Sequence, residues 1–230
     1  MTKIPFIEGA VLLVDKPLNW TSFDVVKKIR FEIINHFKIK KIKVGHEGTL
    51  DPLATGLIVL CTGKKTKTIS ELTVDSKFYE GEIRLGASTP SFDLETEIDH
   101  KYLIPELTLD TLKNLEEKFT GEHHQLPPLF SAKRVKGKRA YEYARKNEFV
   151  ELKPSLISIY KIELKILNKH TLIFKCHCSK GTYMRSLARD IGLSLNSGAH
   201  LISLRRIKSG KFNIEMAKSV EEWIDIIKAS

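Results

Sequence analysis

The sequence lacks the features of several protein classes. Only three of its 230 residues are cysteine, at Cys61, Cys176 and Cys178. An odd number without paired spacing argues against a disulfide framework and indicates a reducing compartment. The longest apolar run near the N-terminus, residues 10–14, is shorter than the core of an export signal. No stretch approaches the ~20 apolar residues of a membrane span. We therefore expect a cytoplasmic protein with no membrane segment.

The sequence also offers little for binding a metal. Cys176, His177 and Cys178 stand next to one another. Neighbouring side chains on a strand point to opposite faces, and no second pair of ligands completes a tetrahedron. We expect these three residues to belong to a strand, and we expect no metal site.

Positive charge is what the chain has in excess. Lys and Arg number 38 against 28 Asp and Glu, which gives a formal charge of +10 and a pI near 9.4. Such a balance favours a polyanionic partner, with nucleic acid as the first candidate, although many basic proteins bind nothing anionic. Hydrophobic residues at 42% are typical of a folded globular chain rather than a disordered one.

Helical and strand patterns interleave along the chain, and no Gly/Ser/Pro-rich linker divides it. Residues 79–85 alternate apolar and polar side chains, as a half-buried strand does, while residues 109–119 carry a helical apolar stripe. Ser22 and Ser219 stand where helix N-caps are expected. We predict one α+β domain over residues 1–230.

One segment, residues 121–150, differs from its surroundings. It contains a Pro127-Pro128 break, after which basic residues greatly outnumber acids, with Tyr141 and Tyr143 interleaved. A solvated surface excursion would account for it, but so would an arm that lies along a phosphate backbone. The basic side chains considered for backbone contacts are Lys133, Arg134, Lys136, Lys138, Arg139 and Arg145.

The most unusual local sequence is residues 45–56, GHEGTLDPLATG, in which three glycines frame His46 and Asp51. Glycine lets the backbone approach a ligand closely, and Pro52 disfavours helix at Asp51. The pattern predicts a stiff loop that holds one carboxylate and leads into a strand. It is equally typical of an Asp-Pro turn without function.

This loop resembles the signature of the TruB-type tRNA pseudouridine synthases, which modify uridine 55 in the T-loop. Further blocks resemble the same family in the same order, from about residue 9 to residue 220. These blocks are residues 9–17 (GAVLLVDKP), 79–86 (YEGEIRLG) followed by Ser88, Thr89 and Asp93, 125–128 (QLPP) with Ser131 and Ala132, 141–145 (YEYAR), 178–187 (CSKGTYMRSL), 204–206 (LRR) and 210–212 (GKF).

The resemblance implies a pseudouridine synthase fold, a central mixed or antiparallel β-sheet flanked by helices. Residues 121–150 would form an inserted, basic, RNA-gripping thumb arm. It implies tRNA, bound at its T-arm, as the partner and a monomeric enzyme. We expect no C-terminal PUA-like domain, which many members of the family carry. The reaction involves no redox change, so we expect no cofactor.

The resemblance also implies roles for single residues. Asp51 matches the essential carboxylate, Tyr79 the tyrosine that stacks on the target base, and Arg185 the arginine that pairs with the aspartate. A guanidinium beside Asp51 would keep that carboxylate charged, because an opposite charge lowers its pKa. The residues matched to substrate binding are His46, Tyr183, Leu204 and Lys16.

Two alternatives stay open at this point. The chain could be a tRNA-folding chaperone that has lost its chemistry, although Asp51, Tyr79 and Arg185 are all present. It could also be a pseudouridine synthase that acts on another RNA. Whether Asp51 attacks the sugar as a nucleophile or removes a ribose proton is likewise open.

Overall fold

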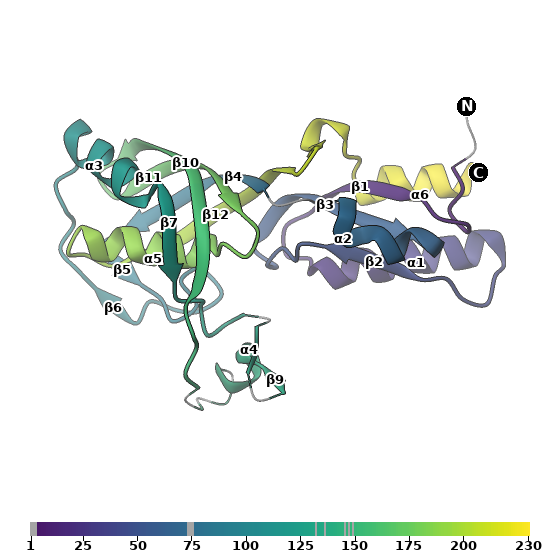
Figure 1. Cartoon of the computed structure of the whole chain (residues 1–230), viewed down its shortest axis with the longest axis horizontal. Coiled ribbons are helices and arrows are strands. Elements are labelled where there is room, and N and C mark those ends of the chain that lie inside the picture. Colours follow the sequence, from purple (N-terminus) through teal and green to yellow (C-terminus); the bar gives the residue numbers. More distant parts are fainter. Residues whose placement is uncertain are drawn as a thin grey trace. The chain divides into compact units, whose positions relative to one another are not determined.

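The computed structural model of the chain describes residues 4–72, 76–131, 133–135, 137–144, 146, 148 and 150–230, without the side chains of Ser70, Arg134 and Ala144. Strands and helices alternate along the described residues (Figure 1). In chain order they are β1 (Val11–Lys16), α1 (Ser22–Phe37), β2 (Val44–Glu47), β3 (Ala54–Thr62), the 3-10 helix η1 (Gly63–Thr68), α2 (Ile69–Leu72), β4 (Ser76–Leu85), β5 (Ala87–Ser88), β6 (His100–Lys101), α3 (Leu109–Phe119), β7 (Gly121–Gln125), β8 (Arg134–Val135), β9 (Lys138–Arg139), α4 (Ala140–Ala144), β10 (Ser155–Asn168), β11 (Thr171–Ser179), α5 (Met184–Ser194), β12 (Ala199–Ser209), β13 (Phe212–Asn213), the 3-10 helix η2 (Ile214–Met216) and α6 (Val220–Lys228).

The main sheet is mixed. Its strands follow one another in the order β1-β3-β12-β4-β11-β10-β7, with β13 added to β12 and β2 added to β3. The β12–β3 pair is parallel, with Leu204 opposite Ala54, whereas the β1–β3, β2–β3 and β10–β11 pairs are antiparallel. A mixed sheet flanked by helices confirms the predicted α+β fold class.

The chain divides into two compact units. The first comprises residues 1–79 and 204–230, and the second comprises residues 80–203. Strands β4 and β12 each contribute residues to both units. The expectation of one catalytic domain without a PUA-like addition stays a prediction.

In the first unit, α1 and α6 cover one face of β1 and β3. Leu12 and Val14 of β1 pack with Ile29 of α1 and Trp223 of α6 in one buried cluster, while Leu13 joins a smaller cluster on the opposite face. This alternation along β1 is what a strand buried on both sides requires. The indole Nε1–H of Trp223 donates to the Leu13 carbonyl over 2.8 Å, so α6 is also hydrogen-bonded to the sheet.

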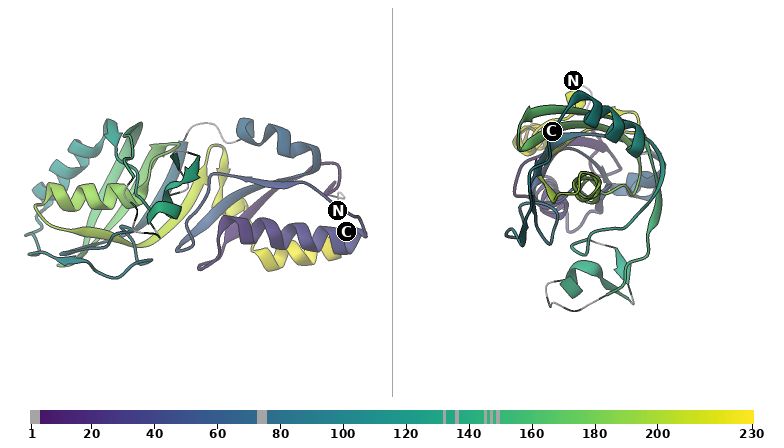
Figure 2. Two further views of the ribbon diagram at one scale, coloured as in Figure 1. Left: turned by 90° about the horizontal axis from the view of Figure 1, so that it is seen from below. Right: turned by 90° about the vertical axis from the view of Figure 1, so that its left-hand side faces the viewer.

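In the second unit, strands curve around α5. The right-hand view of Figure 2 looks along this helix, with strands of its unit passing over it. The face that α5 turns to the sheet includes Leu187, Ala188 and Ile191, all buried. The segment between β7 and β10 carries β8, β9 and α4 and has a small apolar cluster of its own, in which Ala140, Val150 and Leu152 are buried.

One predicted helix cap is correct and one is wrong. Ser219 caps α6 in a capping box with Glu222, as predicted. The cap of α1 is Thr21 and not Ser22: the Thr21 hydroxyl accepts from the Asp24 N–H over 3.0 Å, and the Asp24 carboxylate accepts from the Thr21 N–H over 2.9 Å. Ser22 is the first helical residue, and its side chain is buried.

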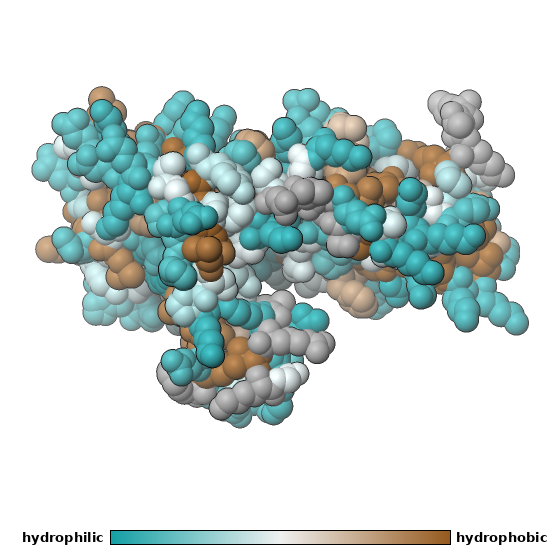
Figure 3. All heavy atoms as spheres, viewed as in Figure 1, coloured by the Kyte–Doolittle hydropathy of each residue, from teal (hydrophilic) through white to brown (hydrophobic). Residues whose placement is uncertain are grey.

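The surface is largely polar on one face of the molecule: on the face drawn in Figure 3, hydrophilic side chains cover most of each unit. Within the part of the chain that the structure describes, no helix combines the length and the apolar character that crossing a membrane would require.

Candidate active site

Asp51 lies in the loop between β2 and β3, in the first unit. Its side chain is neither fully exposed nor fully buried. The Ala54 N–H donates to the Asp51 carbonyl over 3.1 Å, so the chain turns directly after the aspartate and enters β3. The predicted loop does lead into a strand, β3, but residues 45–47, which include His46, belong to β2 and not to the loop.

Both neighbours of Asp51 are anchored. On the N-terminal side, the Ser22 hydroxyl accepts from the Leu50 N–H over 2.8 Å and donates to the Leu50 carbonyl over 3.1 Å. On the C-terminal side, the Pro52 carbonyl accepts from the Asn19 N–H over 2.9 Å. The backbone on either side of the carboxylate is therefore fixed to the segment that begins α1.

Lys16 is the buried cation of this region. Its side chain is fully shielded from solvent. The ammonium donates to the carbonyls of Pro17, Trp20 and Pro52 at 2.8, 2.6 and 3.3 Å. Burial lowers the pKa of Lys16 to about 8, and the charge of Asp51 acts against that lowering. Lys16 therefore holds Pro52, the residue after Asp51, by a hydrogen bond. It also places a positive charge near the Asp51 carboxylate.

A second buried cation, Arg206, lies beneath Gly48. Its Nε donates to the Leu57 carbonyl over 2.7 Å. Gly48 has a left-handed φ of 67°, and a Cβ built on it would lie 3.0 Å from Arg206 Nη1 and 3.0 Å from Lys77 Cε. The loop can approach these two cations so closely because residue 48 has no side chain.

Four buried polar atoms around Gly48 have no hydrogen-bond partner among the described residues. They are Nη1 and Nη2 of Arg206, Nδ1 of His46 and Oε2 of Glu47. Burial and the positive charge of Arg206 lower the pKa of His46, so this imidazole is neutral at pH 7. Buried polar groups are normally hydrogen-bonded, and such a concentration of unpaired ones is typical of a functional site.

Leu204 and Tyr79 belong to the same unit as Asp51. Leu204 lies on β12 and is paired with Ala54 of β3. Ala54 comes three residues after Asp51 in the chain. The next residue, Arg205, forms a bidentate ion pair with Asp15 at 3.1 and 2.6 Å. Tyr79 lies on β4 and is buried.

Arg185 and Tyr183 lie in the second unit. Arg185 is in the first turn of α5 and is buried. Its Nη1 donates to the Ser91 carbonyl over 3.3 Å, and its Nε lies 3.6 Å from Oδ2 of Asp93, which is also buried. Tyr183 is the N-cap residue of α5 and is half-buried. The predicted pair between Asp51 and Arg185 joins the two units and stays a prediction.

Among the six basic side chains considered for RNA backbone contacts, the structure describes those of Lys133, Lys138 and Arg139. Lys138 and Arg139 are exposed, and the Lys138 ammonium lies 5.9 Å from the centre of the Tyr143 ring. Lys133 donates to the Lys153 carbonyl and to the Ser155 hydroxyl, both over 2.8 Å. Arg134 is described only in its backbone, as part of β8, while Lys136 and Arg145 lie outside the described residues. Their RNA contacts stay predictions.

The described residues hold no group of three or more His, Cys, Asp or Glu side chains arranged to bind a metal ion. Cys176, His177 and Cys178 lie on β11, as predicted, and both cysteines are buried.

Comparison with known families decides the class of the protein. Residues 35–184 match the model of the TruB family pseudouridylate synthase N-terminal domain, and residues 185–229 match that of the tRNA pseudouridylate synthase B C-terminal domain. The chain belongs to the TruB family.

Curated relatives support this membership over nearly the whole chain. The chain is 52% identical to the tRNA pseudouridine synthase B of Phocaeicola vulgatus, over 96% of this chain and 95% of the relative. It is 46% identical to the protein of the same name from Flavobacterium johnsoniae, over 94% and 95%.

Solved structures share the fold. A chain in the crystal structure of a Cbf5-Nop10-Gar1 complex superposes with a TM-score of 0.70 at 27% identity, over 96% of this chain. A chain in an H/ACA RNP bound to a substrate RNA containing 2'-deoxyuridine gives 0.67 at 26% identity, over 95% of this chain. The present chain spans 54% and 53% of those two chains.

Sequence reasoning missed several residues that lie beside the candidate site residues. Ser22 looked like a helix cap, and nothing in the local pattern indicates that it binds Leu50. Asp93 was visible only as part of a block resembling the family, yet it is the acid beside Arg185. Arg206 was noted within the Leu-Arg-Arg run, but a buried arginine cannot be distinguished from an exposed one in a basic sequence.

Proposed function

We propose that this chain isomerises uridine 55 in the T-loop of tRNA to pseudouridine. The names of its curated relatives support a tRNA substrate. The observation that carries the chemical part of the proposal is the anchoring of Asp51. Its neighbour Leu50 is hydrogen-bonded to Ser22 at the start of α1, its neighbour Pro52 is hydrogen-bonded to Asn19 just before that helix, and the buried ammonium of Lys16 interacts electrostatically with its carboxylate.

The reaction rearranges bonds within one nucleotide. The bond between N1 of uracil and C1′ of ribose breaks, the base turns, and a bond between C5 and C1′ forms. The proton on C5 leaves and N1 gains a proton, so the product is an isomer of the substrate. An ionised carboxylate serves this sequence either by attacking the sugar or by removing a ribose proton.

Asp51 is the proposed carboxylate. Lys16 supports the charged form of Asp51 from within its own unit. Arg185 is proposed as its guanidinium partner in the complex with RNA, since a planar fork matches a carboxylate. Tyr79 is proposed to stack on the detached uracil and to take the C5 proton, and Tyr183 and Leu204 to line the pocket and exclude water.

The target base must leave its stack before Asp51 can reach the sugar, at a cost of roughly a few kcal/mol. Contacts from the basic arm to the phosphate backbone would offset this cost. His46 is proposed to fill the space that the uridine vacates. Its lowered pKa fits that role, because a neutral imidazole enters a base stack without the desolvation cost of a cation. We also propose that the enzyme is cytoplasmic and monomeric.

The decisive experiment measures tritium released from C5. Unmodified tRNA transcribed with [5-³H]uridine is incubated with the wild-type chain, and a second transcript carries cytidine in place of the T-loop uridine. We expect release from the first transcript only, equal to one proton per tRNA. Asp51→Asn, which keeps the size of the side chain, should abolish release and leave tRNA affinity nearly unchanged.

Other outcomes would point elsewhere. Equal release from both transcripts would mean that the T-loop uridine is not the target. Tight tRNA binding without any release by the wild-type chain would favour a tRNA-folding chaperone. Release from a ribosomal RNA fragment and not from tRNA would assign a different substrate. A loss of binding in Asp51→Asn would refute the catalytic role of Asp51.

A further inference from the structure

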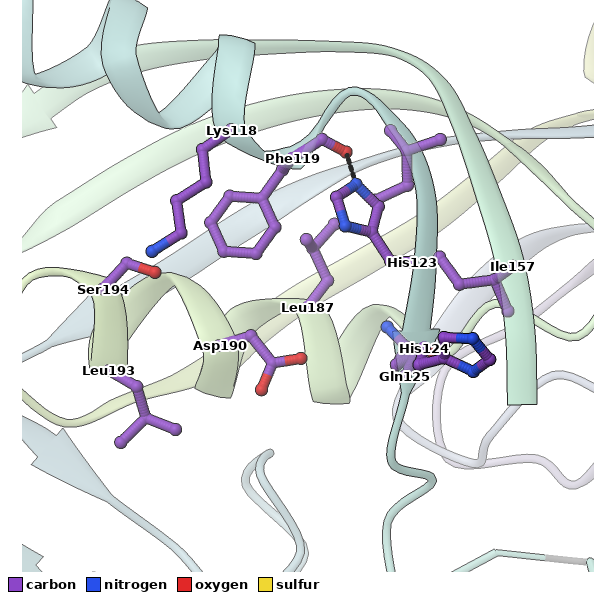
Figure 4. A pocket seen from close by; sticks show the side chains of 11 residues that line it. Lys118, Phe119, His123, His124, Gln125, Ile157, Leu187, Asp190, Leu193 and Ser194 are labelled. Carbon is purple, nitrogen blue, oxygen red and sulfur yellow. Dashed lines mark hydrogen bonds between the residues drawn. The ribbon is translucent and has the colours of Figure 1, made fainter. Parts of the chain in front are cut away.

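Gln125 forms a two-point contact with the backbone of Tyr183. The Tyr183 N–H donates to Oε1 of Gln125 over 2.8 Å, and Nε2 of Gln125 donates to the Tyr183 carbonyl over 3.1 Å. Gln125 is the last residue of β7, and its side chain is 5% exposed. Figure 4 shows it at the end of that strand, beside α5. One planar amide thus satisfies both hydrogen-bonding groups of Tyr183.

This contact fixes the start of α5. Tyr183 is the N-cap residue of the helix, and its own side chain makes no capping hydrogen bond. Its carbonyl also accepts from the Leu187 N–H over 3.0 Å, as the first bond of the helix. A tyrosine is a poor N-cap, because it has no short side-chain oxygen to receive the first helical N–H groups. Gln125 therefore supplies from another strand the fixation that a cap side chain would normally give.

The next residue of the chain reinforces the same junction. The Leu126 carbonyl accepts from the Ser186 hydroxyl over 2.8 Å, and Ser186 is fully buried. Arg185 lies between the two contacts, since Gln125 holds Tyr183 and Leu126 holds Ser186. The guanidinium of Arg185 is held separately by Ser91 and Asp93. Backbone and head group of this arginine are thus fixed by different parts of the unit.

The same glutamine stands at the root of the basic arm. Gln125 lies opposite Ser155, the first residue of β10, so the chain leaves the sheet at one member of this pair and rejoins it at the other; residues 121–125 of the predicted arm belong to β7. The Ser155 hydroxyl accepts from the Lys133 ammonium over 2.8 Å. Gln125 therefore contacts Tyr183 through its side chain, and its backbone stands where the chain leaves the sheet, opposite the residue where the chain returns.

We propose that Gln125 is a positioning residue, which sets the place of Tyr183 and Arg185 through its amide contact with the Tyr183 backbone. This inference rests on the proposed function, because it assigns Gln125 to the site in which Tyr183 and Arg185 act. Gln125 touches no reacting atom. It acts through the first turn of α5, and its loss changes the rate of turnover more than the affinity for tRNA.

A packing role is the competing explanation. Gln125 lines a cavity of about 250 Å³ together with Phe119, Leu187, Asp190 and others (Figure 4). If Gln125 only filled space there, an apolar side chain of similar volume would serve as well. Leucine at this position would then be tolerated, and the protonation state of a glutamate would be irrelevant.

Gln125→Glu separates the two explanations by pH. An ionised glutamate accepts from the Tyr183 N–H but cannot donate to the Tyr183 carbonyl, whereas the protonated acid does both. Burial and the Asp190 carboxylate raise the pKa of a glutamate placed here, whereas Lys118, His123 and His124, which line the same cavity, lower it when they are charged. We expect kcat of Gln125→Glu to be about tenfold below wild type at pH 8, the effect of about one charged hydrogen bond. The ratio of variant to wild type should rise toward one as the pH falls to 5.5.

Two further variants complete the design. Gln125→Leu should be slow at every pH, with tRNA affinity close to wild type. His124→Glu places a charge on the neighbouring, exposed position of β7 and controls for long-range effects on RNA binding. It should follow the wild-type pH profile. Thermal unfolding of each variant at each pH shows that the enzyme is folded. Should Gln125→Leu not fold, the pH dependence of Gln125→Glu decides alone.

The outcomes distinguish this inference from the proposed function. Wild-type kcat in Gln125→Leu, or a flat ratio for Gln125→Glu between pH 8 and 5.5, overturns the positioning role while wild-type turnover stands. A uniform loss of tRNA affinity instead of kcat also overturns it. Absence of turnover by the wild-type chain on every tRNA would refute the proposed function itself.

Discussion

The Ser22 hydroxyl is hydrogen-bonded to both backbone groups of Leu50, the residue that precedes Asp51. One short side chain at the start of α1 therefore determines how the aspartate enters its loop. Thr21, one residue earlier, is exposed and only caps the helix. These adjacent hydroxyl residues differ in what they hold, which makes them a matched pair for mutation.

Ser22→Ala should impair both stability and turnover. It leaves the buried N–H of Leu50 without its partner, at a cost of about 1–3 kcal/mol in the free energy of unfolding. The loop then loses its N-terminal anchor, and kcat should fall on the order of tenfold, since small displacements of a catalytic group are costly. Thr21→Ala should cost about 1 kcal/mol as a lost cap and leave kcat unchanged. Equal kcat values in the two variants would contradict the anchoring role.

The buried Lys16 predicts a distinct pH dependence of stability. Its pKa is lowered from 10.5 to about 8 in the folded chain. Between these values the unfolded state binds more protons than the folded state, so stability contributed at this site rises with pH. Urea unfolding of wild type and Lys16→Met at pH 8, 9 and 10 tests this. The free energy of unfolding of the wild type should rise relative to that of Lys16→Met by about 1.4 kcal/mol per pH unit. Parallel curves would show that Lys16 titrates normally.

Gly48→Ala should destabilise the fold through its contact with Arg206 and Lys77. The left-handed φ of 67° costs about 1–2 kcal/mol with any Cβ. The contacts at 3.0 Å add overpacking, roughly another 1–3 kcal/mol. Gly181→Ala is the control, because Gly181 has φ of 84° and no atom within 4 Å of a built Cβ. A similar loss of unfolding free energy in the two variants would mean that Arg206 and Lys77 make room for the new methyl group at no cost.

Neutralising the exposed cations of the arm should reduce the salt dependence of tRNA binding. The double variant Lys138→Gln, Arg139→Gln removes two charges that the described fold leaves exposed. If both contact phosphates, the slope of log affinity against log salt should become shallower by roughly 0.7–0.9 per contact. Lys165→Gln, Lys169→Gln removes the same charge from two exposed positions, one on β10 and one in the turn that follows it. Equal slopes in both double variants would refute a specific role of the arm.

Lys133 is expected to behave differently from Lys138 and Arg139. Its ammonium is already hydrogen-bonded to the Lys153 carbonyl and the Ser155 hydroxyl at the root of the arm. Lys133→Met should therefore loosen the root, seen as faster amide exchange at Lys153 and Ser155, in addition to any change in the salt slope. Unchanged exchange there would mean that those hydrogen bonds contribute nothing to the order of the arm.

The sequence predicted the elements of this fold better than the contacts between them. Alternation along residues 79–85 and the capping box at Ser219 are local patterns, and β4 and α6 follow them. Ser22 failed as a predicted cap because the adjacent Thr21 has the same hydrogen-bonding chemistry, and the local pattern does not decide which hydroxyl faces inward.

Site residues were predicted where a family motif names them and missed where only tertiary structure brings them into place. Asp51 and Arg185 stand in quoted motifs. Asp93 lies 92 residues before Arg185 in the chain, and no periodicity links the two positions. Arg206 and Lys77 are buried near Gly48 although basic residues are normally exposed, so composition alone points the wrong way.

The arm has an apolar cluster of its own, formed by Ala140, Val150 and Leu152 with Val135 and Tyr143 against them. The side chains that pack within the arm are thus those that face inward, whereas Lys138 and Arg139 face outward. On the proposed function, exchange of the outward residues would alter the contacts with RNA and leave the loop that carries Asp51 undisturbed. Variation among species in this segment, with constancy in the loop, is the evolutionary signature that such an arrangement permits.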